Sequence, residues 1–482
     1  MRDTNKKALK SGVWYTIANF IVKGATFLTT PIFTRLMSQS DVGLYANFNS
    51  WLSIFLIITT FDLYTSISVA RFDFKKNINE YISSNLVFGT TITFAFFLIF
   101  LAFKDTFLSF FGLSFLELFI IFVYCSVYPA FQMFQLKCRI DYKYKASVFL
   151  SVISVLLSIA LSLILVLTLS DKYTGRYIGY LLPQIIFCLV LYIYLLAKGK
   201  KLFSKKYWVY GFTISFPLIW HALAGNILTS SDRLMIKSIC GETDTALYSV
   251  AYSCGILVQV LWISMNSAWS PWAMERFEAK EYTSVKKASI PYCLFFGFVV
   301  LILLLIAPEL LYIMGGDNYM NAVDVIPPIA VSFIFNFVYG FYVDIELYSK
   351  KQIVVAINTV TAAILNIVLN LLLIPIFGYK IAAYTTLAGY MALFVLHFIS
   401  CCILKKAKWF STTFNLIFLS ASLGLMIFSL ILYRYNIIRY ILILALFALL
   451  VIALIIFRKE FMYLIKNKST FAFRKRFKKG DE

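Results

Sequence analysis

The feature that most constrains this chain is a long series of apolar segments, each about as long as a membrane is thick. A helix that crosses the hydrocarbon core needs about 20 apolar residues and satisfies all of its own backbone hydrogen bonds. Hydrophobic residues occupy 61% of the 482 positions, and charged residues only 14%. We therefore predict an all-α polytopic membrane protein with about 14 transmembrane helices.

The apolar segments are bounded by charged residues, Gly and Pro, which set their approximate ends. They lie at residues 11–34, 43–68, 81–103, 113–136, 147–170, 177–197, 208–231, 245–269, 288–311, 322–346, 353–376, 380–404, 412–433 and 437–457. We assign residues 1–200 to an N-terminal six-helix lobe, 201–405 to a C-terminal six-helix lobe and 406–457 to an additional helix pair. Residues 458–482 form a basic cytoplasmic tail.

The distribution of basic residues predicts the orientation in the membrane. With the amino terminus in the cytoplasm, the outside segments hold few of the 44 Lys and Arg residues, namely Arg35, Lys104, Lys172, Arg176, Arg233, Lys237, Lys380, Arg434 and Arg439. Short cytoplasmic loops carry an excess of Lys and Arg, so both termini are predicted to be cytoplasmic. The net charge of +21 then reflects loops and a tail that contact lipid headgroups, and we expect no nucleic-acid binding.

The composition also argues against an enzyme and against a bound cofactor. The eight Cys residues form no CxxC pair and the chain has only two His residues, so we expect no metal site. No loop is long enough to fold as a catalytic domain, and no GxxxxGK[ST] nucleotide-binding loop occurs. Energy for transport would come from a proton or sodium gradient, or from the membrane potential.

One short pattern occurs twice, about 200 residues apart. The first copy reads RLM at residues 35–37 and DVGLY at 41–45, and the second reads RLM at 233–235 and DTALY at 244–248. Both copies lie where one predicted helix ends and the next begins. This repeat predicts two pseudo-symmetric six-helix lobes related by an axis along the membrane normal, with a central cleft where a substrate would bind.

A polar stripe marks the first predicted helix. Thr16, Asn19, Lys23, Thr26 and Thr30 follow one another at spacings of three and four, so they share one helix face. Lys23 lies too far from either helix end to reach the membrane surface. We therefore predict that Lys23 and Asn19 face a wet cavity and bind an anionic substrate, with a structural ion pair as the alternative for Lys23.

Five further polar residues are candidates for substrate binding. Arg35 and Arg233 occupy equivalent repeat positions at the outer mouth, where they bind an anionic headgroup or anchor the interface. Arg71, at the inner end of the second span, meets the same headgroup or simply follows the positive-inside pattern. His221 and Asn226 lie at mid-depth in the seventh span, where they line the cleft or form an interhelical hydrogen bond.

Three carboxylates are candidates for ion coupling. Asp62 lies in the second span, and Asp344 and Glu346 lie near the end of the tenth, all in the inner third of the membrane. A carboxylate at this depth is expected to pair with a basic residue such as Arg71 or Lys23, or to bind a proton or sodium ion.

Several motifs, taken in order, resemble one transporter family over nearly the whole chain. They are SG at 11–12 with Trp14, TRL at 34–36 before DVGLY at 41–45, FDL at 61–63 leading to Arg71, SDRL at 231–234, WSPW at 269–272, APE at 307–309, GGDNY at 315–319, and N-x-x-L-I-P-x-x-G from Asn370 to Gly378 followed by Ala382 and Ala383. In these the chain resembles the Wzx-like oligosaccharide flippases of the multidrug/oligosaccharidyl-lipid/polysaccharide exporter superfamily. It departs from the pattern at Lys380 and Ile381, where many relatives have small residues.

The resemblance implies a V-shaped pair of lobes that alternate between inward-open and outward-open states. It implies transport of an undecaprenyl-diphosphate-linked oligosaccharide from the cytoplasmic to the outer leaflet of the bacterial cytoplasmic membrane, for capsule, O-antigen or exopolysaccharide synthesis. The implied partners are membrane lipids, this polyprenyl-diphosphate-linked oligosaccharide, a polysaccharide polymerase and glycosyltransferases. The alternatives are a lipid II flippase, a toxin-extrusion-type exporter, or, from another class, a membrane-embedded polysaccharide polymerase or ligase.

Overall fold

The computed structural model describes residue 22, residues 24–25, 27–141 and 143–456, with side chains up to residue 448. Within this part the chain forms helices and no strands, which confirms the all-α prediction. Twelve of the described helices are long and apolar enough to cross a membrane. The predicted span at 11–34 lies largely outside the described residues, so the total of 14 stays a prediction, as does the placement of the basic tail.

The first half of the chain follows the predicted spans closely, with two differences. Its elements are α2 (Gln39–Thr60), η1 (Leu63–Ser66), α3 (Ile67–Asp73), α4 (Ile78–Ala102), α5 (Lys104–Phe111), α6 (Phe115–Ile140), α7 (Tyr144–Thr168) and α8 (Lys172–Gly199). The predicted span at 43–68 is wrong in its second part, because Phe61 and Asp62 both adopt left-handed backbone angles that end α2. The short helix α5 lies in a segment that was predicted as a loop.

The second half contains longer helices than the apolar pattern predicts. They are α9 (Lys205–Cys240), α10 (Glu242–Glu278), α11 (Tyr282–Gly315), η2 (Asp317–Val325), α12 (Ile326–Tyr348), α13 (Gln352–Phe377), α14 (Ile381–Ile403), η3 (Ala407–Trp409), α15 (Thr412–Leu432) and α16 (Asn436–Ile456). Helices α9 and α10 have 36 and 37 residues, more than the roughly 20 that a bilayer core requires. Their ends therefore extend beyond the apolar region.

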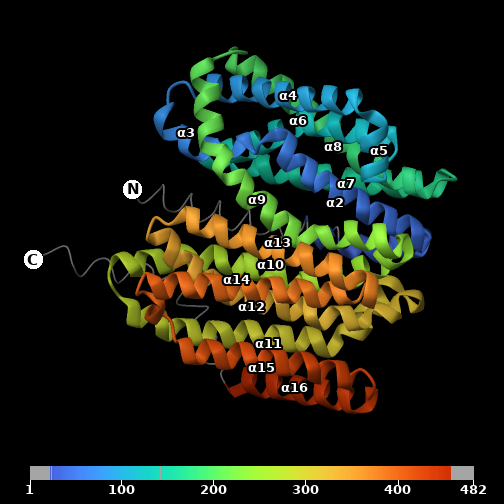
Figure 1. The fold of residues 1–482 in the computed structure, drawn as a ribbon, viewed down its shortest axis with the longest axis vertical. Coiled ribbons are helices and arrows are strands. Elements are labelled where there is room, and N and C mark those ends of the chain that lie inside the picture. Colours follow the sequence, from blue (N-terminus) through green and yellow to red (C-terminus); the bar gives the residue numbers. More distant parts are fainter. Residues whose placement is uncertain (1–21, 23, 26, 142, 457–482) are drawn as a thin grey trace, which may run out of the picture.

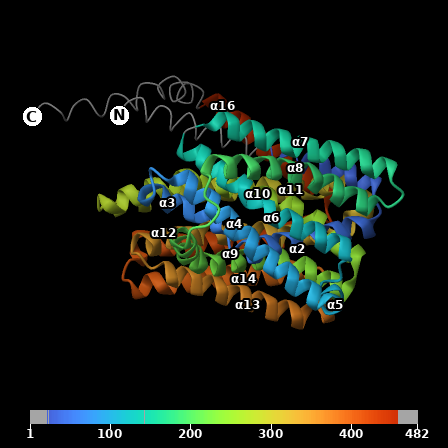
Figure 2. The same cartoon turned by 90° about the horizontal axis from the view of Figure 1, so that it is seen from above.

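The helices pack as two bundles joined by α9. Helix α8 packs against α4, α6 and α7, and α12 packs against α10 and α14. Helix α9 contacts α2 and α4 as well as α10 and α13, and Figure 1 shows it running from the upper blue-to-teal bundle to the lower green-to-orange one. Seen from above in Figure 2, α13 and α14 lie on the side opposite α7. We name these bundles the N-lobe (α2–α8) and the C-lobe (α9–α14); the predicted boundaries at residues 200 and 405 stay predictions.

Small residues hold α7 and α8 together in the N-lobe. Ser158 and Ser162 of α7 are fully buried and share a helix face. A Cβ atom added to Gly179 of α8 would lie 2.4 Å from the Cα atom of Ser162, so the two backbones are in contact there. In a bilayer, where apolar burial gives no net driving force, such close backbone approach is a main source of helix association.

The two lobes meet at the end of the molecule that the positive-inside pattern assigns to the outside, which we call the outer end. Side chains from residues 34–40 donate hydrogen bonds to the C-lobe here, in the pairs Thr34–Met314 (2.5 Å), Arg35–Ile313 (3.0 Å), Gln39–Asn318 (2.8 Å) and Ser40–Glu242. The first three acceptors are backbone carbonyl oxygens. These contacts form a polar outer seal between the lobes.

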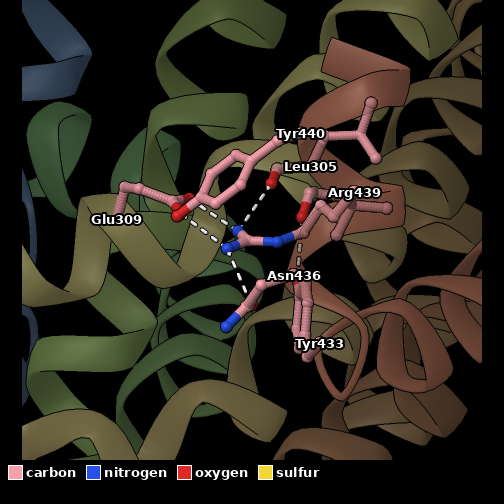
Figure 3. Close-up of polar contacts among 7 residues, drawn as sticks. Leu305, Glu309, Tyr433, Asn436, Arg439 and Tyr440 are labelled. Atoms are coloured by element: carbon pink, nitrogen blue, oxygen red, sulfur yellow. Dashed lines mark hydrogen bonds and ion pairs between the residues drawn. The ribbon is translucent and has the colours of Figure 1, made fainter.

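Figure 1 shows helices α15 and α16 at the far side of the C-lobe. An ion pair attaches α16 to α11. Arg439 is only 2% exposed and forms two parallel hydrogen bonds of 2.6 Å to the carboxylate of Glu309 on α11. It also donates to the carbonyl oxygen of Leu305, and the Tyr440 hydroxyl donates to Glu309, as Figure 3 shows. A bidentate pair of this kind fixes both the position and the rotation of α16.

We expect Arg439→Met to lower the free energy of unfolding by about 1–3 kcal/mol, because it leaves the Glu309 carboxylate and the Leu305 carbonyl without a charged donor. Arg434→Met is the matched control, since Arg434 lies exposed just before the same helix. Thermal unfolding followed by tryptophan fluorescence measures both variants. Equal midpoints for the two would contradict this account of the ion pair.

Candidate functional site

Two connected cavities run through the interior of the described structure. The interlobe cavity, of about 390 Å³, lies between residues 30–37, α2 and α8 on one side and α9 and α10 on the other. The N-lobe cavity, of about 490 Å³, lies among α2, α6, α7 and α8 and extends toward the inner end. Asn49, Ser53 and Tyr180 line both cavities, so the two cavities adjoin and form one path that has polar side chains along it.

Arg176 is the most distinctive residue of the interlobe cavity. Its guanidinium lies 3.4 Å from the ring centre of Phe33 and 4.7 Å from that of Tyr45, so it stacks between two aromatic side chains. The side chain is 7% exposed, and its Nη1 atom has no hydrogen-bond partner among the described residues. A buried guanidinium with a free donor is costly without a partner, which indicates an anionic ligand at this position.

Arg233 approaches the same cavity from the C-lobe. Its guanidinium lies 4.4 Å from the ring centre of Tyr252, and Nη1 donates a 3.0 Å hydrogen bond to the carbonyl oxygen of Thr229. Arg176 and Arg233 therefore face one cavity from opposite lobes. None of the described residues that line this cavity is acidic, so its charge is positive.

The N-lobe cavity is lined by amide and hydroxyl groups. Tyr124 donates a 2.7 Å hydrogen bond to Gln184, and Gln135 donates one of 2.6 Å to Ser151. Arg139 lies at its inner end, and its described lining contains no acidic residue. Neutral donors and acceptors of this kind suit the hydroxyl groups of sugars, whereas the arginines suit phosphate.

The outer seal lies directly above the interlobe cavity and uses both copies of the repeat. A Cβ atom added to Gly43 would lie 1.9 Å from the carbonyl oxygen of Glu242 and 3.2 Å from the nitrogen of Ala246. Gly43 and Ala246 are the small residues at the same position of the two repeat copies. The repeat therefore places two small residues where α2 and α10 cross, and the acidic residue before each lies in the first turn of its helix.

The structure separates the other predicted binding residues. Arg35 donates to the carbonyl oxygens of Pro31 and Ile313, so it belongs to the outer seal rather than to the cavity lining. Arg71 is exposed on α3, next to the ring of Phe72, and lines neither cavity. Of the repeat-equivalent pair Arg35 and Arg233, only Arg233 faces the cavity.

The predicted residues of the first and seventh spans have different positions. Lys23 and Asn19 lie outside the described residues, and their roles stay predictions. Asn226 accepts a 3.1 Å hydrogen bond from Ser53, which lines both cavities, so it joins α9 to the path. His221 is exposed on α9 and lines neither cavity.

The predicted coupling carboxylates are buried, but they do not pair with Arg71. Asp62 is 6% exposed and has no ion-pair partner among the described residues. Asp344 accepts a 2.6 Å hydrogen bond from Ser270 on α10. Glu346 lies 2.7 Å from His397 of α14, and both side chains are fully buried. None of the three carboxylates pairs with Arg71 in the described structure, so ion coupling stays a prediction for them, and Glu346 has His397 as a further partner.

A further buried carboxylate, Asp232, lies next to Arg233. It accepts hydrogen bonds from Tyr248 (2.5 Å), Thr386 (2.6 Å) and Asn370 (2.7 Å), which belong to α10, α14 and α13. Asp232 and Asn370 are 0% exposed, and Asp232 has no ion-pair partner among the described residues. A buried carboxylate without an ion-pair partner is a candidate for binding a proton or a cation.

The described residues contain no cluster of three or more His, Cys, Asp or Glu side chains that would hold a transition metal. Asp232 is instead surrounded by hydrogen-bond donors, namely the amide nitrogen of Asn370 and the hydroxyl groups of Tyr248 and Thr386. Asn366 and Thr385 contact Asn370 in turn. A proton or a hard cation on the carboxylate would compete with these donors, so the cluster is a candidate site for a coupling ion.

Comparison with known proteins identifies a family that matches the sequence and solved structures that share the fold. The family profile described as "Polysaccharide biosynthesis protein" matches residues 8–277. No curated protein matches the sequence. Among solved structures, the lipid II flippase MurJ in an inward closed conformation has a TM-score of 0.67 at 14% identity, and the match covers 94% of this chain and 100% of that one.

Two transporters of the MOP superfamily are also similar. A MATE family multidrug resistance transporter in an inward-facing conformation has a TM-score of 0.57 at 13% identity, covering 85% of this chain and 95% of the other. A transporter from Pyrococcus furiosus, described as having a binding pocket of reverse polarity, has a TM-score of 0.52 at 16% identity, covering 83% and 97%. At these identities the likeness shows the fold alone.

Proposed function

Because the chain belongs to the polysaccharide biosynthesis protein family, we propose that it flips a polyprenyl-diphosphate-linked oligosaccharide from the cytoplasmic to the outer leaflet. Members of this family and the structural neighbours are transporters and flippases, not enzymes, so the polymerase and ligase alternatives are set aside. The undecaprenyl carrier, the bacterial cytoplasmic membrane and a pathway for capsule, O-antigen or exopolysaccharide belong to the same proposal.

The observation that supports this proposal best is the charge of the interlobe cavity. Arg176 and Arg233 face it from opposite lobes, and Arg176 keeps a buried donor without a partner. Guanidinium groups bind phosphate with parallel hydrogen bonds, and a diphosphate offers enough oxygen atoms for both. A cavity with this charge would repel cationic drugs, which argues against the toxin-extrusion alternative.

In this proposal, different parts of the substrate bind in the two cavities. The diphosphate would lie against the arginines, and the sugars against the amides and hydroxyls of the N-lobe cavity, such as Gln132, Gln135 and Gln184. The polyprenyl tail would remain in the bilayer, because it gains nothing by entering a polar path. The outer seal must open for release, so the hydrogen bonds of residues 34–40 would break in each transport cycle.

We propose that Asp232 binds the coupling proton or sodium ion. Asp232 lies on α9, and its hydrogen-bond partners lie on α10, α13 and α14. Binding of an ion or a proton to Asp232 would therefore change how α9 packs against the C-lobe. The neighbouring residue in the chain, Arg233, lines the interlobe cavity. Ion binding and substrate binding would therefore be linked through one turn of α9. Asp62, Asp344 and Glu346 stay alternative coupling residues, and the membrane potential stays an alternative energy source.

We expect Asp232→Asn to abolish the ion dependence of flipping, because the amide keeps the size of the side chain but carries no charge and can neither hold a cation nor exchange a proton. The rate at several sodium concentrations and pH values is the measurement. Asp105→Asn is the control, since Asp105 is exposed on α5 and lines neither cavity. An Asp232→Asn protein with the full ion dependence of the wild type would remove Asp232 from coupling.

The proposed substrate can be tested in cells by deleting the gene. Deletion of the gene is expected to remove the surface polysaccharide and to accumulate lipid-linked oligosaccharide in the cytoplasmic leaflet, and re-expression of the wild type restores both. The lipid II alternative predicts a different result, namely accumulation of lipid II and loss of cell-wall integrity. Normal surface polysaccharide in the deletion strain would contradict the proposal.

A further inference from the structure

An apolar groove lies on the surface of the molecule, away from the two cavities of the transport path. It has a volume of about 370 Å³ and is lined by Phe88, Phe203, Lys205, Trp208, Val209 and Phe212. None of these residues lines the interlobe or the N-lobe cavity. The groove is formed by α4, by the start of α9 and by the segment that joins α8 to α9.

The groove is rigid at its centre because Trp208 is fixed on several sides. Its ring stacks on Phe88 with 4.6 Å between ring centres and meets Phe203 edge-on at 4.8 Å. Its indole nitrogen donates to the carbonyl and hydroxyl oxygens of Ser84 on α4, at 2.9 and 3.0 Å. The polar atom of Trp208 is thus satisfied inside the protein, and its apolar face is left for the groove.

Lys205 lines the groove, and four further lysines lie near it in the chain, at the end that the positive-inside pattern makes cytoplasmic. These exposed residues are Lys198, Lys200, Lys201, Lys205 and Lys206, and we call them the lysine cluster. Among these, Lys201 forms an ion pair with Glu80 at 3.6 Å, the one ion pair of the cluster within the described structure. The cluster therefore has a large uncompensated positive charge beside an apolar groove.

The apolar surface continues from the groove toward the membrane centre. Phe212, Phe216 and Trp220 are spaced by four residues on α9, so they share one face. Their rings pack in sequence, with centres 5.1 and 6.2 Å apart. Phe216 is 41% exposed and Trp220 is 53% exposed. These three side chains form a narrow apolar strip along α9, a shape that suits a lipid acyl chain.

We propose that this groove binds an anionic phospholipid, with its headgroup at the lysine cluster and an acyl chain along Phe203, Trp208, Phe212 and Phe216. Charge complementarity selects the anionic class, because lysines near the membrane surface attract acidic headgroups. At the equivalent inner segment of the C-lobe, Lys406 lies over the rings of Tyr348 and Trp409 and donates to Ser349, as Lys206 lies over Phe74 in the N-lobe. This segment therefore serves as the control for the lysines in the test.

The position of the groove gives the lipid a mechanical role. The carbonyl oxygen of Lys201 accepts a 2.9 Å hydrogen bond from Ser83, and Asn85 donates to the carbonyl oxygen of Tyr207 at 3.3 Å. These contacts attach the start of α9 to the N-lobe, while the end of α9 belongs to the C-lobe through Asp232. A lipid that bridges α4 and α9 would strengthen the attachment at the point where α9 leaves the N-lobe.

The test compares thermal stability of the purified full chain with added phosphatidylglycerol or phosphatidylcholine of identical acyl chains. We expect phosphatidylglycerol to raise the unfolding midpoint of the wild type by about 3 °C more than phosphatidylcholine does. The double variant Lys205→Gln/Lys206→Gln and the single variant Phe203→Ser are each expected to lose at least half of this increment. The control Lys405→Gln/Lys408→Gln, at the equivalent segment of the C-lobe, is expected to keep it.

Three results would overturn the proposal. They are an equal effect of the two lipids on the wild type, a full increment in both groove variants, and an equal loss in the control. A further measurement adds soluble glycerol phosphate, which has the headgroup phosphate but no acyl chain. An equal rise of the unfolding midpoint with this compound would show a phosphate site and not a lipid site. The measurement needs no transport substrate, so its outcome is independent of the proposed flippase function.

Discussion

Arg176→Gln is expected to lower the rate of flipping by about 10- to 100-fold. The substitution removes the buried guanidinium that faces the interlobe cavity between Phe33 and Tyr45. A hydrogen bond to a charged group contributes about 1.5–3 kcal/mol, which corresponds to this range of rates if the diphosphate contacts Arg176 in the transition state. The rate of Arg176→Lys is expected to lie between those of the wild type and Arg176→Gln, because lysine keeps the charge but lacks the planar, stacking guanidinium.

The matched control for Arg176 is Arg71→Gln. Arg71 is exposed on α3 and lines neither cavity, so its loss is expected to change the rate by less than about twofold. Both variants are compared at equal protein abundance in the membrane. Wild-type flipping by Arg176→Gln would show that the anionic headgroup passes elsewhere, and a strong defect in Arg71→Gln would place the headgroup at the inner end of α3.

Gly43→Ala is expected to shift the protein toward a state in which the outer seal is open. The new methyl group would lie 1.9 Å from the carbonyl oxygen of Glu242, a distance that backbone atoms cannot tolerate, so α2 and α10 must separate. Overpacking of this kind costs about 1–3 kcal/mol in the sealed state and nothing in the open one. We expect the equilibrium to shift by about tenfold or more and flipping to fall correspondingly.

The shift is measured as a distance between spin labels at Thr106 on α5 and Asp317 on η2, which are exposed at the outer end of the N-lobe and C-lobe. The label background replaces Cys240 and Cys402, the cysteines that are not buried. Gly89→Ala is the control, because its added Cβ would make only an ordinary 3.7 Å contact with Leu63. A sealed distance distribution in Gly43→Ala, equal to that of the control, would contradict the assigned role of this crossing.

Hydropathy predicted the helices well because a bilayer leaves no other way to satisfy the backbone of an apolar segment. The predicted span 353–376 corresponds to α13 (Gln352–Phe377), and 147–170 corresponds to α7 (Tyr144–Thr168). The repeat was also informative, since Gly43 and Ala246 meet where the lobes cross. The break at Phe61 and Asp62 was not predictable in this way, because Phe rarely adopts left-handed backbone angles and the surrounding sequence is apolar, although Asp adopts them more often.

Two functional residues were missed for one physical reason. Charged residues were used to mark where a span ends, so Arg176 and Asp232 were placed just outside the spans 177–197 and 208–231. The structure extends α8 to Lys172 and α9 to Cys240, which brings both residues inside a helix. Each charge is accommodated by partners distant in sequence, Phe33 and Tyr45 for Arg176 and Asn370 and Thr386 for Asp232. Such partners appear only after the chain has folded.

The central claim is that the positive interlobe cavity passes a lipid-linked anionic sugar. Purified protein in liposomes that carry a fluorescent polyprenyl-diphosphate oligosaccharide tests it directly, with transbilayer movement followed by quenching of the label in the outer leaflet. We predict rapid movement with the wild type, a rate about 10- to 100-fold lower with Arg176→Gln, and no transport of a cationic dye. Equal movement by the wild type and Arg176→Gln, or movement of the dye but not of the oligosaccharide, would contradict the account.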